Sequence, residues 1–171
     1  MSRPEIGTAG GFEPSAASWF VDRAPVQVGM YIGTLGVQAF KFRDWSTNPD
    51  KSFGLFQLVN AGMLVGVPLR YFRLYGGGGV DMGLTWLSAD PDVKSTSYYI
   101  GWRALAGLEL WITNGFGLAL EYSRRGSLMD VKFEGADAAD PSYTFSKLGL
   151  DSLMFGFVFS PETNLMAVKR K

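Results

Sequence analysis

The sequence predicts an all-β protein, an antiparallel up-and-down transmembrane β-barrel of eight strands. Three observations lead to this prediction. Apolar residues alternate with small or polar residues over long stretches, which is the period of a strand with two different faces. Short turn signals alternate with longer polar connections along the chain. Only 19% of the 171 residues are charged, against about 25% in an ordinary soluble domain.

Three parts are expected along the chain. Residues 1–18 are small and polar and contain two prolines, so we expect a flexible N-terminal segment. Residues 19–160 carry the alternating pattern and form the predicted barrel. Residues 161–171 form either a C-terminal tail or a short final strand. The stretch Ser15–Arg23 suits a short amphipathic helix or an early strand equally well.

Six long strands are predicted in the central part. Several are longer than the usual 5 or 6 residues of a soluble strand and reach the roughly 9–11 that cross a bilayer. The six are Val26–Arg43, Ser52–Phe72, Gly76–Ser88, Ser97–Ile112, Phe116–Val131 and Tyr143–Ser160. The first contains Ile32–Gly36, which is either a kink or a turn. Small bacterial barrels have an even count of at least 8, so a further pair comes from the Trp19 region and the tail, or from dividing the first segment.

The connections are of two kinds. Arg73–Gly76 and Thr113–Gly115 are short, and the second contains the Asn-Gly pair that favours tight hairpins. The longer connections, at residues 44–52, 88–97 and 133–142, are polar and partly acidic. We expect short turns at one end of the barrel and long loops at the other, where an extracellular partner would bind.

The alternation also suits a soluble lipocalin-like barrel, whose apolar face points inward. The composition of the other face favours the membrane barrel, because Gly, Ala and Ser dominate it and its few charges have both signs. These charges form a predicted network inside the lumen, made of Arg70, Asp81, Arg103, Glu109, Glu121 and Arg125. Arg103 or Arg125 is expected to pair with Glu109 or Glu121.

Aromatic residues are expected in two places. Those that end the apolar faces are typical of a girdle at the membrane surface, and they are Tyr71, Trp86, Tyr98 and Tyr122. Those on the opposite face either pack inside the barrel or line a site for a small apolar ligand, and they are Tyr31, Tyr75, Tyr99 and Trp111.

Composition excludes much chemistry. The chain has no His and no Cys, which removes the commonest general base, the commonest metal ligands and thiolate catalysis. We therefore expect no enzyme activity, no metal and no cofactor. The formal net charge is +0, which argues against a nucleic-acid partner. The chain has no apolar signal-peptide region, so an exported protein would have lost its signal peptide already.

Three passages resemble the small outer-membrane β-barrel proteins of the OmpA/OmpX-like superfamily. They are VGVPLRYF before a tight turn, GWRALAGLELWITNGFGLALEYSRR as a strand–turn–strand unit, and LMFGFVF, which ends in Phe159 like the family's terminal strand. The resemblance covers Val26 to Ser160. It departs from the family in the residues SPETNLMAVKRK, which follow the terminal aromatic residue.

The resemblance implies a protein of the bacterial outer membrane, in contact with the lipid bilayer and lipopolysaccharide. The family's lipid A deacylases and its palmitoyltransferase use His, which this chain lacks. The expected function is therefore a non-enzymatic barrel with a side-chain-filled lumen, structural or adhesive through its long polar loops. The alternative is a narrow pore, or a barrel that binds a small apolar ligand.

Overall fold

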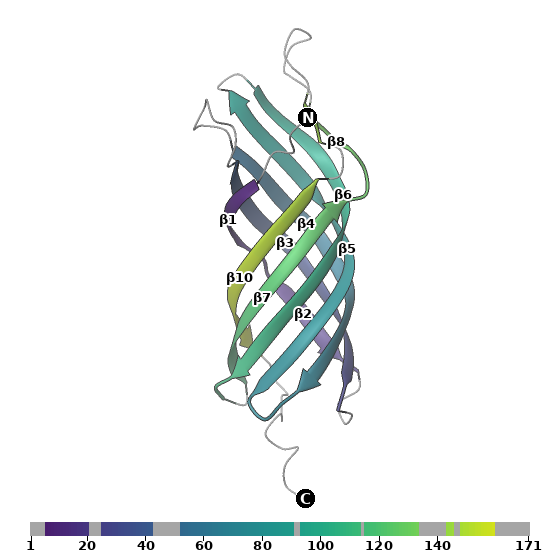
Figure 1. The fold of residues 1–171 in the computed structure, drawn as a ribbon, viewed down its shortest axis with the longest axis vertical. Coiled ribbons are helices and arrows are strands. Elements are labelled where there is room, and N and C mark those ends of the chain that lie inside the picture. Colours follow the sequence, from purple (N-terminus) through teal and green to yellow (C-terminus); the bar gives the residue numbers. More distant parts are fainter. Residues whose placement is uncertain are drawn as a thin grey trace, which may run out of the picture.

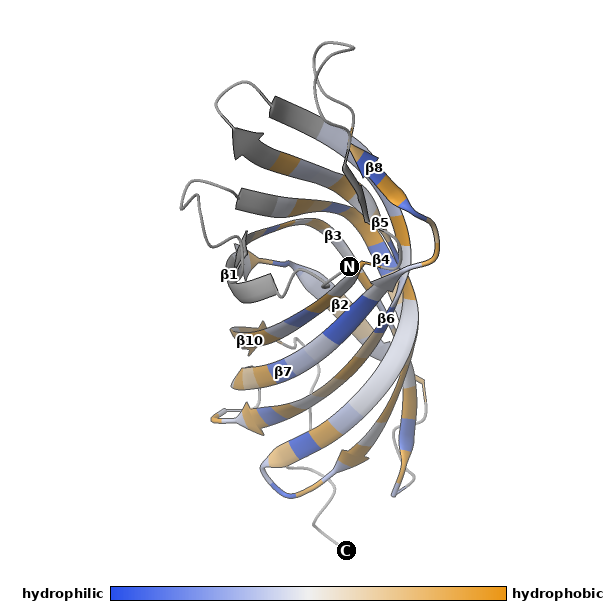
Figure 2. Ribbon diagram, turned by 45° about the horizontal axis from the view of Figure 1, so that its top comes forward, coloured by the Kyte–Doolittle hydropathy of each residue, from blue (hydrophilic) through white to orange (hydrophobic). Residues whose placement is uncertain are grey.

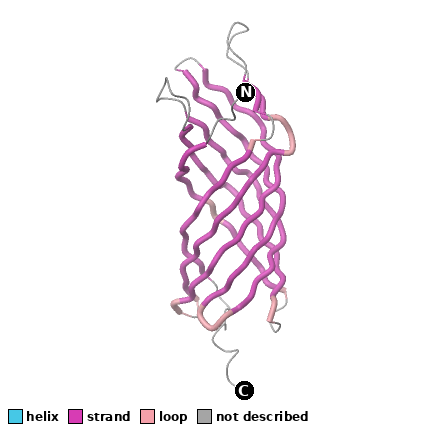
Figure 3. The backbone as a smooth tube through the Cα atoms, viewed as in Figure 1, coloured by secondary structure: helices cyan, strands magenta, loops and turns pink. Residues whose placement is uncertain are grey.

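The computed structural model describes residues 6–20, 25–42, 52–90, 93–113, 115–133, 143–145 and 148–159. Over these residues the protein is all-β and its main sheet is antiparallel, as the sequence predicts. The sheet curls into a half-barrel (Figure 1). Figure 3 shows the strands running obliquely around it, joined by short loops at the lower end.

The main sheet contains eight strands in the order β1-β3-β4-β5-β6-β7-β10, with β2 also paired to β3. Its strands are β1 (Ile6–Phe12), β2 (Ser15–Trp19), β3 (Gln27–Phe42), β4 (Ser52–Pro68), β5 (Phe72–Asp90), β6 (Val93–Trp111), β7 (Phe116–Ser127) and β10 (Gly149–Phe159). A separate hairpin joins β8 (Val131–Phe133) to β9 (Tyr143–Phe145). Because β1 and β2 pair with successive parts of β3, they share one position around the sheet.

The N-terminal segment differs from the sequence prediction of a flexible region over residues 1–18. The described part of it forms β1 and β2, which pair with β3 through Phe12 opposite Val37 and Ser15 opposite Gly33. These strands consist mainly of Gly, Ala and Ser, which carry little β-propensity and little hydrophobic contrast. The ladder to β3, a long-range contact, is what orders them.

Of the two alternatives for Ile32–Gly36, a kink or a turn, the turn is absent, and the stretch is an irregularity within a continuous strand. β3 passes through it, and Leu35 adopts a left-handed φ of 55°. Pairing with β4 is interrupted between Thr34 opposite Val59 and Gly36 opposite Gln57. Before the interruption the odd-numbered residues of β3 face inward, and after it the even-numbered residues do. The strand therefore keeps polar side chains inside the sheet on both sides of the interruption.

The lower turn between β4 and β5 lies earlier than predicted. β4 ends at Pro68, and the Leu69 N–H donates to the Phe72 carbonyl oxygen over 2.7 Å, which closes the turn. The predicted turn at Arg73–Gly76 instead belongs to β5. Proline cannot donate a ladder hydrogen bond, which accounts for the earlier end of β4. The predicted turn at Thr113–Gly115 does connect β6 to β7, and the Thr113 hydroxyl accepts the Phe116 N–H over 3.1 Å.

The predicted loops lie mostly outside the described residues. That holds for residues 44–51 and 134–142. The third, at 88–97, is shorter than predicted, because β5 continues to Asp90 and β6 begins at Val93.

The two faces of the sheet have opposite character, and Figure 2 shows the alternation along individual strands. The apolar residues face outward and are exposed, including Met63, Val65, Val80, Leu153 and Phe155. Of the charged residues on strands of the main sheet whose side chains are described, only Arg124 and Asp151 lie on the outer face. The sheet therefore directs most of its large apolar side chains outward and most of its described charges inward.

Candidate functional site

A cluster of buried charges occupies the inside of the half-barrel, and Glu13 lies at its centre. Glu13 follows β1 and precedes Pro14, and its side chain is only 2% exposed. One carboxylate oxygen, Oε1, pairs with Arg103 of β6, and the other, Oε2, pairs with Arg125 of β7. Asn60 Nδ2 also donates to Oε1 over 2.7 Å. The carboxylate of the N-terminal segment therefore links strands from opposite parts of the sheet.

Arg125 is also held by side chains of two further strands. Its Nε lies 2.9 Å from Asp81 Oδ2 of β5, and both side chains are almost completely buried. Its Nη1 donates to Gln38 Oε1 of β3 over 2.6 Å, and Gln38 Nε2 in turn donates to Glu13 Oε2 over 3.1 Å. A buried guanidinium needs such a set of acceptors, because an unpaired charge in this environment would be costly.

Arg103 makes the second half of the cluster. Its Nη2 donates to Glu121 Oε1 of β7 over 2.6 Å. Glu121 also accepts the Tyr75 hydroxyl over 3.0 Å, and the guanidinium lies 5.8 Å from the centre of the Tyr31 ring. Tyr31 belongs to a buried cluster with Leu64 and Leu105, against which Tyr75 packs. The charges are thus seated on an apolar layer.

A separate ion pair lies nearer the short turns. Arg73 Nη1 donates to Glu109 Oε2 over 2.9 Å, across the ladder between β5 and β6. The guanidinium lies 4.6 Å from the centre of the Trp19 ring and 6.0 Å from that of Trp111. Both charged side chains are largely buried, so this pair closes the lower interior together with the two indoles.

Five of the six charges predicted for the network lie inside, and one does not. Asp81, Arg103, Glu109, Glu121 and Arg125 face the interior, and Arg103 pairs with Glu121. Arg70 is exposed in the turn after β4, with its guanidinium 4.9 Å from the Tyr71 ring centre. The displacement of this turn puts Arg70 outside the sheet and Arg73 into the interior.

Several interior residues are not among those that the sequence predicts. The sequence places Glu13 in the predicted flexible segment and Arg73 in a predicted turn. Gln38 and Asn60 are buried polar residues that face inward, but the predicted network contains only charged residues and therefore does not include them. One signal was available for Arg73, since it is two residues before Tyr75 and therefore on the same face of an extended strand.

Glycines make room for the buried aromatic rings. A Cβ at Gly107 would lie 2.4 Å from Cζ of Tyr75, and a Cβ at Gly62 would lie 2.7 Å from Cε1 of Tyr31. The predicted interior aromatics Tyr31, Tyr99 and Trp111 are buried, and Tyr75 is partly buried. The glycine-rich inner face is therefore filled by large side chains from neighbouring positions.

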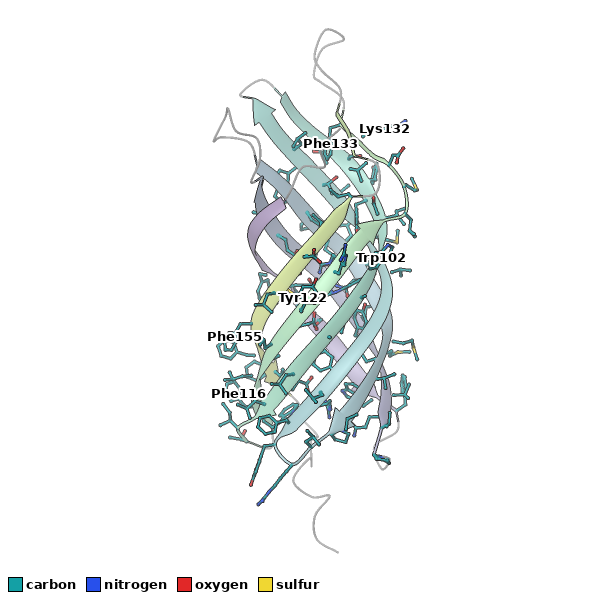
Figure 4. The ribbon with its side chains drawn as sticks, in the orientation of Figure 1. Trp102, Phe116, Tyr122, Lys132, Phe133 and Phe155 are labelled. Carbon is teal, nitrogen blue, oxygen red and sulfur yellow. The ribbon has the colours of Figure 1, made fainter. Side chains whose placement is uncertain are left out.

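The four predicted girdle residues are found on the outer face or at its ends. Tyr71 lies in the lower turn, whereas Tyr98 is 79% exposed toward the upper end of β6. Trp86 covers Gly54, its partner on β4. Tyr122, labelled in Figure 4, donates to Asp151 over 2.7 Å, just below the exposed Arg124–Asp151 pair. Phe116 and Phe155 project outward at a lower level.

Each of the four interior carboxylates, Glu13, Asp81, Glu109 and Glu121, has an arginine partner within 3 Å. No group of three or more potential metal ligands occurs within the described residues. The cluster can hold strands together and fill the interior.

Comparisons with protein-family models, with curated proteins and with solved structures found no match for this chain. Within the described ranges, no helix has both the length and the apolar character required to cross a membrane.

Proposed function

We propose that this protein is a non-enzymatic outer-membrane β-barrel protein whose lumen is filled by side chains. One observation carries the proposal, namely that the burial pattern is inverted relative to a soluble protein. Seven charged residues are directed inward, while the outer face exposes large apolar side chains over most of its strands. An exposed apolar surface of this extent marks a site of contact with lipid or with another protein.

Lipid accounts for this surface better than a protein partner does. The exposed apolar residues lie on every strand from β3 to β7 and on β10, so they surround the sheet instead of forming one patch. The longer strands have 16 to 19 residues, which exceeds the roughly 9–11 needed to cross the hydrocarbon layer. The resemblance to the OmpA/OmpX-like superfamily agrees with a bacterial outer membrane, where lipopolysaccharide would be a neighbour.

The interior favours a lumen filled by side chains over a pore. The Glu13 cluster joins β3 to β7 through side chains that are almost completely buried. The apolar layer and the Arg73–Glu109 pair lie below it. Without conduction or catalysis, the remaining role is structural or adhesive, through the connections at 44–52, 88–97 and 133–142.

The membrane proposal is tested by folding in the presence and absence of lipid. We expect the purified chain to become β-rich only in detergent or phospholipid vesicles, and to change its gel mobility on boiling. A monodisperse, β-rich protein in detergent-free buffer would overturn the proposal and favour a soluble barrel.

Planar-bilayer recording tests whether the lumen is filled by side chains or conducts ions. We expect no steady current from the wild-type protein. A steady current that grows when Glu121 is replaced by Gln would favour the narrow-pore alternative, because the charges would then face water. The matched control is Asp151→Asn, which removes a carboxylate from the outer face.

A further inference from the structure

The two outermost positions of the sheet each leave one edge without a ladder among the described residues. β10 pairs with β7 on one side, and β1 and β2 pair with β3 on one side. No ladder joins β10 to β1 or β2, although β1 lies near β10. Figure 1 shows β10 at the front and β2 at the back of the half-barrel. The open side therefore lies along β2 and the lower half of β10.

The direction of the strands determines what can fill this space. Every ladder from β2 through β3, β4, β5, β6 and β7 to β10 is antiparallel. That makes six reversals, so β2 and β10 run in the same direction. A direct ladder between them would be parallel, whereas one strand placed between them would be antiparallel to both.

On the strands beside the open edges, inward-facing side chains are less buried than inward-facing side chains elsewhere in the sheet. Ala17 pairs with Tyr31 and shares its inward face, yet Ala17 is exposed while Tyr31 is buried. On the inward face of β10, Met154 and Val158 are only half-buried. A Cβ added at Gly156 would meet nothing within 4 Å. Among the described residues, no strand lies against these edges.

We infer that residues 160–171 form that strand, between β10 and β2. They follow β10 at its lower end, so a turn at residues 160–163 would direct them back along its free edge. Residues 164–171 would extend about 26 Å at about 3.3 Å per residue, enough to pass β2. Further up, β1 comes near β10, so less space remains to be filled there.

A four-residue turn sets the register of this strand against β10. It places Ala167 opposite Gly156 on the inward face and Val168 opposite Phe155 on the outward face. Met166 and Val168 would then be exposed outside, like the apolar residues of β10. Lys169 would face inward, where the described charges comprise four carboxylates and three arginines.

This occupant is favoured over an unfilled edge for a physical reason. Unpaired backbone N–H and C=O groups each cost several kcal/mol in lipid, and an exposed edge also invites pairing with other chains. The inference rests in part on the proposed function, since the cost is greatest in a membrane. The strand directions and the exposure of Ala17 do not depend on a membrane.

Disulfide trapping tests the inference, because the chain has no Cys of its own. The full-length double variant Gly156→Cys/Ala167→Cys is folded, oxidised and digested, and linked peptides are identified by mass spectrometry. Directly opposed residues in an antiparallel ladder have Cα atoms about 4.5–5.5 Å apart, which a disulfide spans. We expect several-fold more intramolecular disulfide than in the control pair Gly156→Cys/Val168→Cys, whose side chains would lie on opposite faces.

Other outcomes would overturn the inference. A disulfide in Ala17→Cys/Gly156→Cys, at a yield above that of the 156/167 pair, would mean that β2 and β10 close directly. Disulfide-linked dimers of the 156/167 variant would mean that a second copy covers the edge. Equal yields for the 156/167 pair and its control would also reject the proposed strand.

Hydrogen exchange on the wild-type protein gives a second, variant-free measurement. We expect consecutive backbone amides from Met154 to Val158 to be protected, because a strand with two neighbours pairs on both edges. Protection of only alternate amides would contradict the inference. If the chain folds without lipid and the 156/167 disulfide still forms, the membrane proposal fails and the inference about the strand stands.

Discussion

Glu13→Gln is the substitution expected to disturb the interior most for the smallest change in shape. The glutamate accepts hydrogen bonds from Arg103, Arg125, Asn60 and Gln38. Glutamine keeps one oxygen in the same place, so it can still accept from one guanidinium. Its amide nitrogen then faces the other guanidinium, which is also a donor.

The magnitude follows from the partners that remain. Breaking a buried ion pair by removing one partner costs about 3–5 kcal/mol. Arg103 retains Glu121 and Arg125 retains Asp81, so neither guanidinium is stranded. The loss is then closer to that of one or two charged hydrogen bonds, and we expect the free energy of unfolding to fall by about 2–4 kcal/mol.

The assay is urea unfolding of the protein folded in phospholipid vesicles, followed by tryptophan fluorescence in both directions. The control is Asp151→Asn, which breaks the exposed Arg124–Asp151 pair, 3.9 Å long, and should leave the midpoint unchanged. In an Arg103→Met background, the added cost of Glu13→Gln should be smaller, because the two residues share one network. If Glu13→Gln matched the Asp151→Asn control, the carboxylate would not be seated among the arginines, and our account of the interior would be refuted.

Three further substitutions test separate parts of the structure. Val65→Arg places a charge on the exposed apolar face, and we expect about 2–4 kcal/mol of destabilisation in vesicles, measured by the same urea assay; no change would place Val65 outside the lipid. Arg73→Met should lower the urea midpoint, whereas Arg70→Met should not, because only Arg73 has a buried carboxylate partner; equal effects would contradict the turn position. Gly107→Val should displace the Tyr75 ring and reduce stability by about 1–3 kcal/mol, and an unchanged midpoint would show that the ring does not cover the glycine.

The strands from β3 to β7 and β10 were predictable because their two faces differ so strongly. The outward positions of β4, such as Met63 and Val65, are apolar, while the inward positions include Asn60 and Gly62. That contrast has a period of two over many residues, which no helix reproduces. Boundaries were less predictable. In the sequence, Arg70 and Arg73 are each compatible with a turn or a strand. The hydrogen bond from the Leu69 N–H to the Phe72 carbonyl oxygen shows that the turn contains Arg70 and not Arg73.

The centre of the site was not predictable from local pattern. Glu13 stands in a stretch of small residues with no alternation, so nothing near it in the sequence marks it as buried. Its partners, Arg103 and Arg125, are separated from it by 90 and 112 positions. The pairing exists because β1 and β2 both attach to β3, which carries the carboxylate into the interior. Only the sheet topology supplies this information.

The glycine content and the charge cluster have a common physical cause. A narrow interior cannot accept a long side chain at every inward position, so each large residue needs a small neighbour. Tyr75 lies against Gly107, and Tyr31 lies against Gly62. These rings then exclude water from the Arg103 guanidinium, which strengthens its attraction to Glu121 and makes an unpaired charge there costly. The same small residues that weaken each strand on its own therefore allow the cross-strand ion pairs that hold the strands together.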